Sequence, residues 1–226
     1  MDFIGIIRSL EELLYEVMTW LIFYPRTMLR ILFNPTQMTL YSDTELHDAP
    51  TERYTDSLSP PLLLMLTIAL THGIELAVGL KATSDLRADS VLAGIMASEK
   101  NLLIIRALVT AIIPLVIALV AMRAQRQPLD RSTLRQPFFS QCFLATPFAF
   151  VLSMANVIGR RGGDTADGIA MALAIAAFIW FCWAETRWVA RQQDLGPGQA
   201  VLAGVGSVAL AMAVALGVAA AMTLLL

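Results

Sequence analysis

Hydrophobic residues along this chain gather into long, nearly uninterrupted runs that are separated by short polar segments. A helix needs about 20 apolar residues to cross the hydrocarbon core of a membrane. Lipid cannot satisfy backbone hydrogen bonds, and runs of this length do not suit barrel strands of roughly ten residues. We therefore predict an all-α, polytopic membrane helix bundle. Its five transmembrane helices are expected at residues 58–80, 101–122, 138–158, 165–185 and 199–222.

The first 33 residues follow a different pattern, in which apolar side chains occupy one helical face and polar ones the other. Trp20, Tyr24, Arg26 and Arg30 follow the amphipathic part and suit the headgroup zone of a membrane. We predict one or two amphipathic interfacial helices over residues 3–33, with packing on a partner or on the bundle as the alternative. The apolar face consists of Phe3, Ile6, Ile7, Leu10, Leu13, Leu14, Val17, Met18 and Leu21.

Residues 36–57 are polar and acidic, and they predict a solvated linker between the interfacial region and the bundle. The chain is therefore expected to have two parts. Residues 1–57 form a cytoplasmic region of amphipathic helices and acidic linker, and residues 58–226 form the transmembrane bundle. The acidic side chains of the linker are Asp43, Glu45, Asp48, Glu52 and Asp56.

Composition supports the membrane assignment and excludes several function classes. Hydrophobic residues make up 57% of the chain and charged residues 15%, whereas soluble domains carry about 25% charged residues. The net charge of −2 argues against a nucleic-acid partner. Cys142 and Cys182 lie inside apolar runs and are expected to be small buried hydrophobes rather than ligands or a disulfide. No cleavable signal peptide is expected, because the first apolar run lacks a small-residue cleavage pattern.

The distribution of basic residues predicts an orientation, since arginine and lysine concentrate in cytoplasmic loops. With five spans, the side that holds the N-terminus carries ten basic residues and the opposite side five. A cytoplasmic N-terminus and an external C-terminus follow, in a bacterial cytoplasmic (inner) membrane. The ten are Arg8, Arg26, Arg30, Arg53, Arg123, Arg126, Arg131, Arg135, Arg187 and Arg191, and the five are Lys81, Arg87, Lys100, Arg160 and Arg161.

Small residues repeat every four positions in the last span, a spacing that lets helix backbones approach closely in lipid. The preferred interpretation is packing inside the monomer. The alternative is contact with a partner membrane protein or a second copy of the chain. The stripe consists of Ala203, Ser207, Ala211, Ala215 and Ala219.

Polar residues that can ionise interrupt the first span, and such side chains usually face the protein interior and find a partner. His72 and Glu75 share one helical face. At a rise of 1.5 Å per residue, Glu75 and Arg106 reach a similar depth from the external side, which predicts an ion pair. Asn156 and Asp167 arrive at comparable height. These five residues are binding or gating candidates around an external polar pocket, and a satisfied structural network is the alternative.

Signatures of enzymes are absent from the sequence, which contains no HExxH, Walker or GxSxG motif. The spacing of His72 and Glu75 is compatible with metal ligands, yet two histidines in the whole chain argue against a metal centre. We therefore expect a protein that is not an enzyme and that binds no metal or cofactor.

The layout resembles that of the Yip family of Rab-interacting membrane proteins and their bacterial, permease-like relatives. The resemblance covers residues 25–222 and rests on Asn34 and Pro35, the acidic linker, the five clustered spans, and a third span with Phe138, Phe139 and Pro147. It implies a five-span bundle with a cytoplasmic N-terminus that organises membranes or partner proteins. The leading functional hypothesis is accordingly an accessory or organising subunit of a membrane complex. The alternative is a transporter or channel for a small solute or ion.

Overall fold

The computed structural model describes residues 3–49, 52–80 and 98–225. Within these ranges the chain forms seven helices and no strand, which confirms the predicted all-α class. The helices are α1 (Phe3–Phe33), α2 (Pro35–Glu45), α3 (Pro60–Ala77), α5 (Glu99–Ala124), α6 (Arg131–Gly159), α7 (Asp164–Gln192) and α8 (Pro197–Leu225).

Five of these helices are long and apolar enough to cross a membrane: α3, α5, α6, α7 and α8. Each coincides with a predicted span, and α1 does not meet the same criterion. The chain is therefore a multi-pass membrane protein by the length and composition of its helices. Apolar side chains on their outer faces suit contact with lipid, among them Ile104, Leu108, Ile179, Leu202 and Leu216.

Helix α6 begins earlier than predicted because polar residues before the apolar run continue the helix. Asp130 caps it by accepting hydrogen bonds from the backbone N–H groups of Ser132 and Thr133. The Ser132 hydroxyl also donates to Asp130, and this bond, followed by the two backbone bonds, favours the carboxylate and lowers the pKa of Asp130 to about 2. The Thr133 hydroxyl accepts in return from the backbone N–H of Asp130, which completes a capping box.

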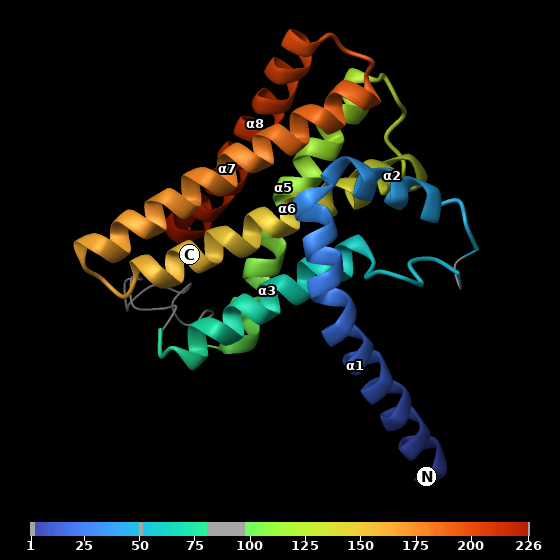
Figure 1. Cartoon of the computed structure of the whole chain (residues 1–226), viewed down its shortest axis with the longest axis vertical. Helices are drawn as coiled ribbons and strands as arrows, with labels where there is room; N and C mark the ends of the chain where they lie inside the picture. The colour runs from blue at the N-terminus through green and yellow to red at the C-terminus, as the bar shows by residue number, and fades with distance from the viewer. Residues whose placement is uncertain (1–2, 50–51, 81–97, 226) are drawn as a thin grey trace.

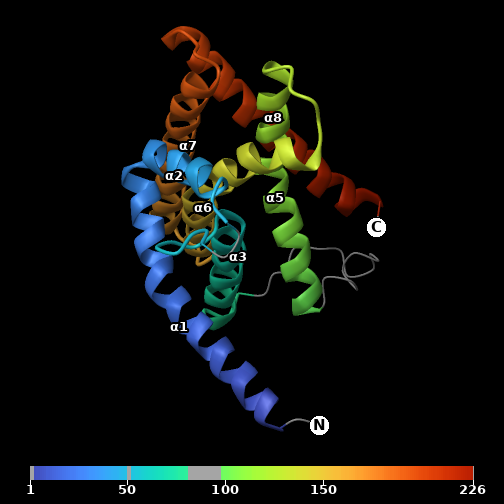
Figure 2. The same ribbon diagram turned by 90° about the vertical axis from the view of Figure 1, so that its right-hand side faces the viewer.

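The helices are arranged in three layers, with α6 in the middle (Figure 1). Helices α3, α6 and α7 lie side by side in the central layer. Figure 2 shows α1 and α2 on one face of this layer and α5 and α8 on the other. The core forms where α5, α6, α7 and α8 meet, and there the rings of Phe148 and Phe181 stack with their centroids 4.9 Å apart.

The small residues of α8 pack inside the monomer, as the preferred interpretation predicted. Ser207, Val208, Ala211 and Ala215 are buried, and the last three belong to the core. A Cβ added to Gly204 would lie 2.8 Å from the Cα of Thr186 on α7, so the backbones of the two helices approach closely there. This face of α8 is therefore occupied within the monomer.

Helix α1 is one continuous helix that contains Pro25, and Pro35 begins α2 at its first turn. Tyr24 Oη lies 2.9 Å from Thr67 Oγ1 on α3, while Trp180 Nε1 on α7 donates to the backbone oxygen of Leu32. Since α3 and α7 flank α6 on opposite sides, α1 runs across the central layer rather than along it, as Figure 1 also shows.

The structure differs from the predicted solvated linker over residues 36–45, which belong to α2. Met38, Thr39 and Ser42 are buried, and α2 packs on α6. Ser140 Oγ donates to Asp43 Oδ1 at 3.0 Å. The acidic composition indicated solvent, but one face of α2 packs against α6, and Asp43 bonds to that helix instead of facing water.

Candidate functional site

An ion pair joins α3 to α5. Arg106 Nη1 lies 2.5 Å from Glu75 Oε2 and 3.5 Å from His72 Nδ1. Glu75 and His72 are buried, whereas Arg106 is partly exposed. A guanidinium that contacts both side chains satisfies a carboxylate that would be costly to leave uncompensated inside a membrane.

The local sequence places the two charges at the same depth. Glu75 lies in the last turns of α3, which ends at Ala77, and Arg106 lies in the second turn of α5. His72 and Glu75 are three residues apart and therefore project from one face of α3. The sequence prediction of a Glu75–Arg106 contact is confirmed.

A cleft of about 820 Å³ opens beside this ion pair. Helix α6 contributes Ser153 and Asn156 to the lining, and Arg160 follows directly after this helix. Helices α3 and α5 contribute Thr71, Glu75, Arg106 and Thr110. Helix α7 adds Asp167 and a row of small or apolar side chains, namely Ala170, Met171 and Ala174.

The structure divides the five predicted site residues into two groups. Glu75 and Arg106 line the cleft as a pair, and His72 contacts Arg106 from outside the lining. Asn156 and Asp167 also line the cleft but are exposed, and neither is hydrogen-bonded to Glu75 or Arg106 among the described residues. Polar groups at the end of α6 and the start of α7 therefore lie apart from the ion pair, and a space remains between the two groups.

The charges around the cleft are balanced. Glu75 and Asp167 are acidic, and Arg106 and Arg160 are basic. Threonine, serine and asparagine side chains supply neutral donors and acceptors between them. Such a cleft suits a small ligand that carries both signs of charge or several polar groups, rather than an anion or a cation alone.

Sequence reasoning missed a second polar pair, deep between α6 and α7. Gln141 Nε2 donates a hydrogen bond to Glu185 Oε1 at 3.1 Å, and both side chains are 0% exposed. The predicted span ends at Glu185, where a carboxylate normally reaches water. The sequence did offer one sign of this pair. Glu185 has no basic residue one helical turn before it, because positions 181 and 182 are Phe and Cys.

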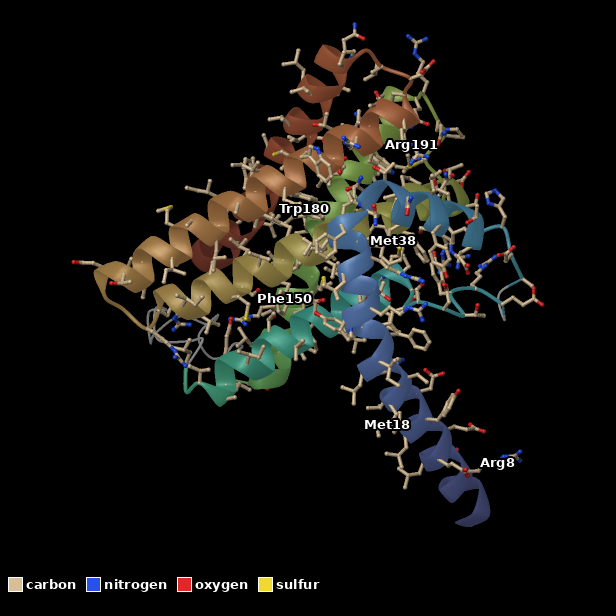
Figure 3. The ribbon with its side chains drawn as sticks, in the orientation of Figure 1. Arg8, Met18, Met38, Phe150, Trp180 and Arg191 are labelled. Carbon is tan, nitrogen blue, oxygen red and sulfur yellow. The ribbon has the colours of Figure 1, made fainter. Side chains whose placement is uncertain are left out.

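The outer half of α1 carries an apolar face that no described part of the chain covers. Every described side chain from Arg8 to Met18 is exposed, including Leu14 at 58% and Met18 at 60%. Figure 3 shows Arg8 and Met18 on the part of α1 that projects away from the bundle. Further along the same helix, the side chains of Thr27 and Ile31 are fully buried.

Comparison of the chain with protein-family models, with curated proteins and with solved structures finds no match. The resemblance to the Yip family stays a prediction.

Proposed function

We propose that this chain is a non-enzymatic membrane protein that acts as an accessory or organising subunit, with α1 as its contact element. The observation that carries the proposal is the outer half of α1, whose apolar face is exposed although the helix is anchored at its other end. An amphipathic helix that leaves a membrane bundle stabilises itself by burying this face in the headgroup region or in a partner.

The anchoring of α1 supports this role because it fixes the direction in which the helix leaves the bundle. Arg30 Nη1 bonds to Asp56 Oδ2 at 3.1 Å, and the backbone N–H of Leu58 donates to Thr27 Oγ1. With α3, α6 and α7 as membrane spans, α1, which crosses the layer that they form, would lie along the membrane surface. With the N-terminus in the cytoplasm of a bacterial cell, α1 would rest on the inner leaflet of the cytoplasmic membrane.

Site-specific photo-crosslinking in native membranes tests the proposal. A crosslinking residue at Leu14 should capture lipid or one defined membrane protein, because Leu14 lies on the apolar face. The matched position is Glu12, an exposed residue of the same turn on the polar face. Capture at Leu14 that is lost in a Leu10→Ser, Met18→Ser variant supports α1 as the contact element. Equal capture at Leu14 and Glu12 would overturn it.

A second candidate function, binding and transfer of a small polar solute, is favoured by the cleft beside Glu75 and Arg106. The two candidate functions differ in one respect: a transfer protein moves solute when it is purified and alone, whereas an accessory subunit does not. Purified protein in liposomes should exchange zwitterionic solutes such as amino acids, and Ser153→Leu, which narrows the cleft, should reduce the exchange. Leu202→Ala on the outer face of α8 is the matched control that should leave it unchanged. No exchange of any solute by the folded protein would remove this candidate.

A further inference from the structure

The Gln141–Glu185 pair lies in the bundle interior and is separate from the cleft. Glu185 accepts through Oε1 from the amide of Gln141, while Oε2 of Glu185 and Oε1 of Gln141 have no hydrogen-bond partner among the described residues. Both side chains are fully buried. A buried polar atom without a hydrogen-bond partner loses its hydration without compensation, so two such atoms on neighbouring side chains require an explanation.

The chemistry of the carboxyl and carboxamide groups explains the two unpartnered oxygens. An ionised carboxylate can only accept hydrogen bonds, and the oxygen of a carboxamide can also only accept. The two orphaned oxygens therefore cannot satisfy each other while Glu185 is charged. If Oε2 carries a proton, it becomes a donor to Gln141 Oε1. The two side chains then form a reciprocal acid–amide pair with two hydrogen bonds.

The charged groups nearby do not compensate a negative charge on Glu185. On α7, the guanidinium of Arg187 stacks over Trp183, and Arg191 donates to the backbone oxygen of Thr36. Cys182 lies one turn away and is a thiol, which carries no positive charge. Trp188 Nε1 donates to no described residue, so it does not stabilise the carboxylate either.

Among the residues that the structure describes, the neighbouring helices place no counter-charge against Glu185 either. On α2, Asp43 accepts from Ser140, the residue before Gln141, and is itself acidic. On α3, His72 and Glu75 contact Arg106 of α5. Helix α8 has no ionisable side chain from Pro197 to Leu225. The part of α5 that joins the core is apolar and consists of Ile113, Ile117 and Ala121.

We propose that Glu185 is an intramembrane proton-binding site. A proton from water forms an O–H bond at Oε2, and the resulting donor completes the pair with Gln141, which links α6 to α7. When the proton returns to water, the electron pair stays on the carboxylate, one of the two hydrogen bonds is lost, and a charge remains between the two helices. This site does not depend on the function proposed for α1 or for the cleft.

Infrared spectroscopy of the full chain in lipid tests the site. At neutral pH the wild-type protein should show the carbonyl stretch of a protonated carboxylic acid, which should disappear on titration to alkaline pH. Glu185→Gln should remove this band, because glutamine reproduces both hydrogen bonds without a titrating proton. Glu75→Gln, at the ion-paired carboxylate, should leave the band in place. Identical acid bands in the wild type and Glu185→Gln over the whole titration would overturn the proposal.

A second variant covers the case in which Glu185→Gln does not fold. Gln141→Ala retains the carboxyl and removes the amide that contacts it, so the band should persist at a higher frequency as the carbonyl loses its hydrogen bond. Ser140→Ala, one residue earlier on α6, is the matched control and should not shift the band. A band that is unmoved by Gln141→Ala would show that Glu185 does not form the acid–amide pair.

Discussion

Glu75 on α3 and Arg106 on α5 are in direct contact, with Oε2 and Nη1 2.5 Å apart, although the two residues are separated by 31 positions in the sequence. The carboxylate is almost fully buried, and the guanidinium reaches the cleft. The contact fixes the relative depth of α3 and α5, because a shift by one helical turn would separate the two charges by about 5.4 Å along the axis.

Removal of one member of this pair should destabilise the protein more than removal of both. Loss of one partner of a buried pair costs about 3 to 5 kcal/mol, whereas replacement of both by apolar residues is often nearly neutral. The midpoint of thermal unfolding in detergent should therefore be lower for Glu75→Leu than for Glu75→Gln. The double variant Glu75→Leu, Arg106→Leu should recover much of the stability that Glu75→Leu loses. Additive effects of the two substitutions would show that the residues do not interact.

The close approach of α7 and α8 predicts a different response at two glycines of α8. A methyl group at Gly204 would meet the backbone of Thr186 at 2.8 Å, and Gly204→Ala should lower stability by about 1 to 3 kcal/mol. Gly206 has no atom within 4 Å of such a methyl group. Gly206→Ala should be neutral or slightly stabilising in the same thermal assay. Unchanged stability of Gly204→Ala would show that α7 and α8 do not approach each other closely at this position.

Acid should loosen the junction between α1 and α2. The pKa of Asp56 is lowered, first by the hydrogen bond from Tyr41 Oη at 2.5 Å and then by Arg30. A depressed carboxyl pKa contributes stability above its unfolded value, and this contribution is lost as pH falls through the folded value. In Asp56→Asn, the free energy of unfolding should therefore fall less steeply with decreasing pH than in the wild type. Glu52→Gln, at an exposed carboxyl, should leave the pH dependence unchanged.

Asp43 should respond in the opposite sense. Burial raises its pKa, although hydrogen bonds from Ser140 and Gln136 act against this shift. The folded state then binds a proton more readily than the unfolded chain, so the contribution of Asp43 to stability grows as pH falls through the folded value. Asp43→Asn should raise stability near neutral pH relative to the wild type. A fall in stability would mean that the charged carboxylate of Asp43 stabilises the fold through Ser140 and Arg191.

The orientation of the chain is predicted to place the N-terminus in the cytoplasm and the C-terminus outside. The reason is the ten-to-five distribution of basic residues about the five spans. Alkaline phosphatase fused to the C-terminus should be active, and the same enzyme fused to the N-terminus should be inactive. A cytoplasmic reporter should give the reverse pattern. Activity that places both termini on one side would contradict five crossings.

The sequence by itself determined the helical class, the five long apolar helices and the Glu75–Arg106 contact. These follow from rules that act along the chain: run length against bilayer thickness, and rise per residue between adjacent antiparallel helices. The sequence did not predict α2, because the acidic side chains of that segment indicated solvent while its buried residues are few and short.

The tertiary structure decided the features that depend on which helices become neighbours. Gln141 and Glu185 lie 44 positions apart on α6 and α7, and the sequence of neither segment identifies the other as its partner. Their burial against each other follows from the packing of α6 in the middle layer. In the same way, only the crossing of α1 over α3 and α7 shows that one half of α1 is packed and the other exposed. A local sequence pattern predicts which face of a helix is buried. It does not predict which helix covers that face, because one apolar face fits many others equally well.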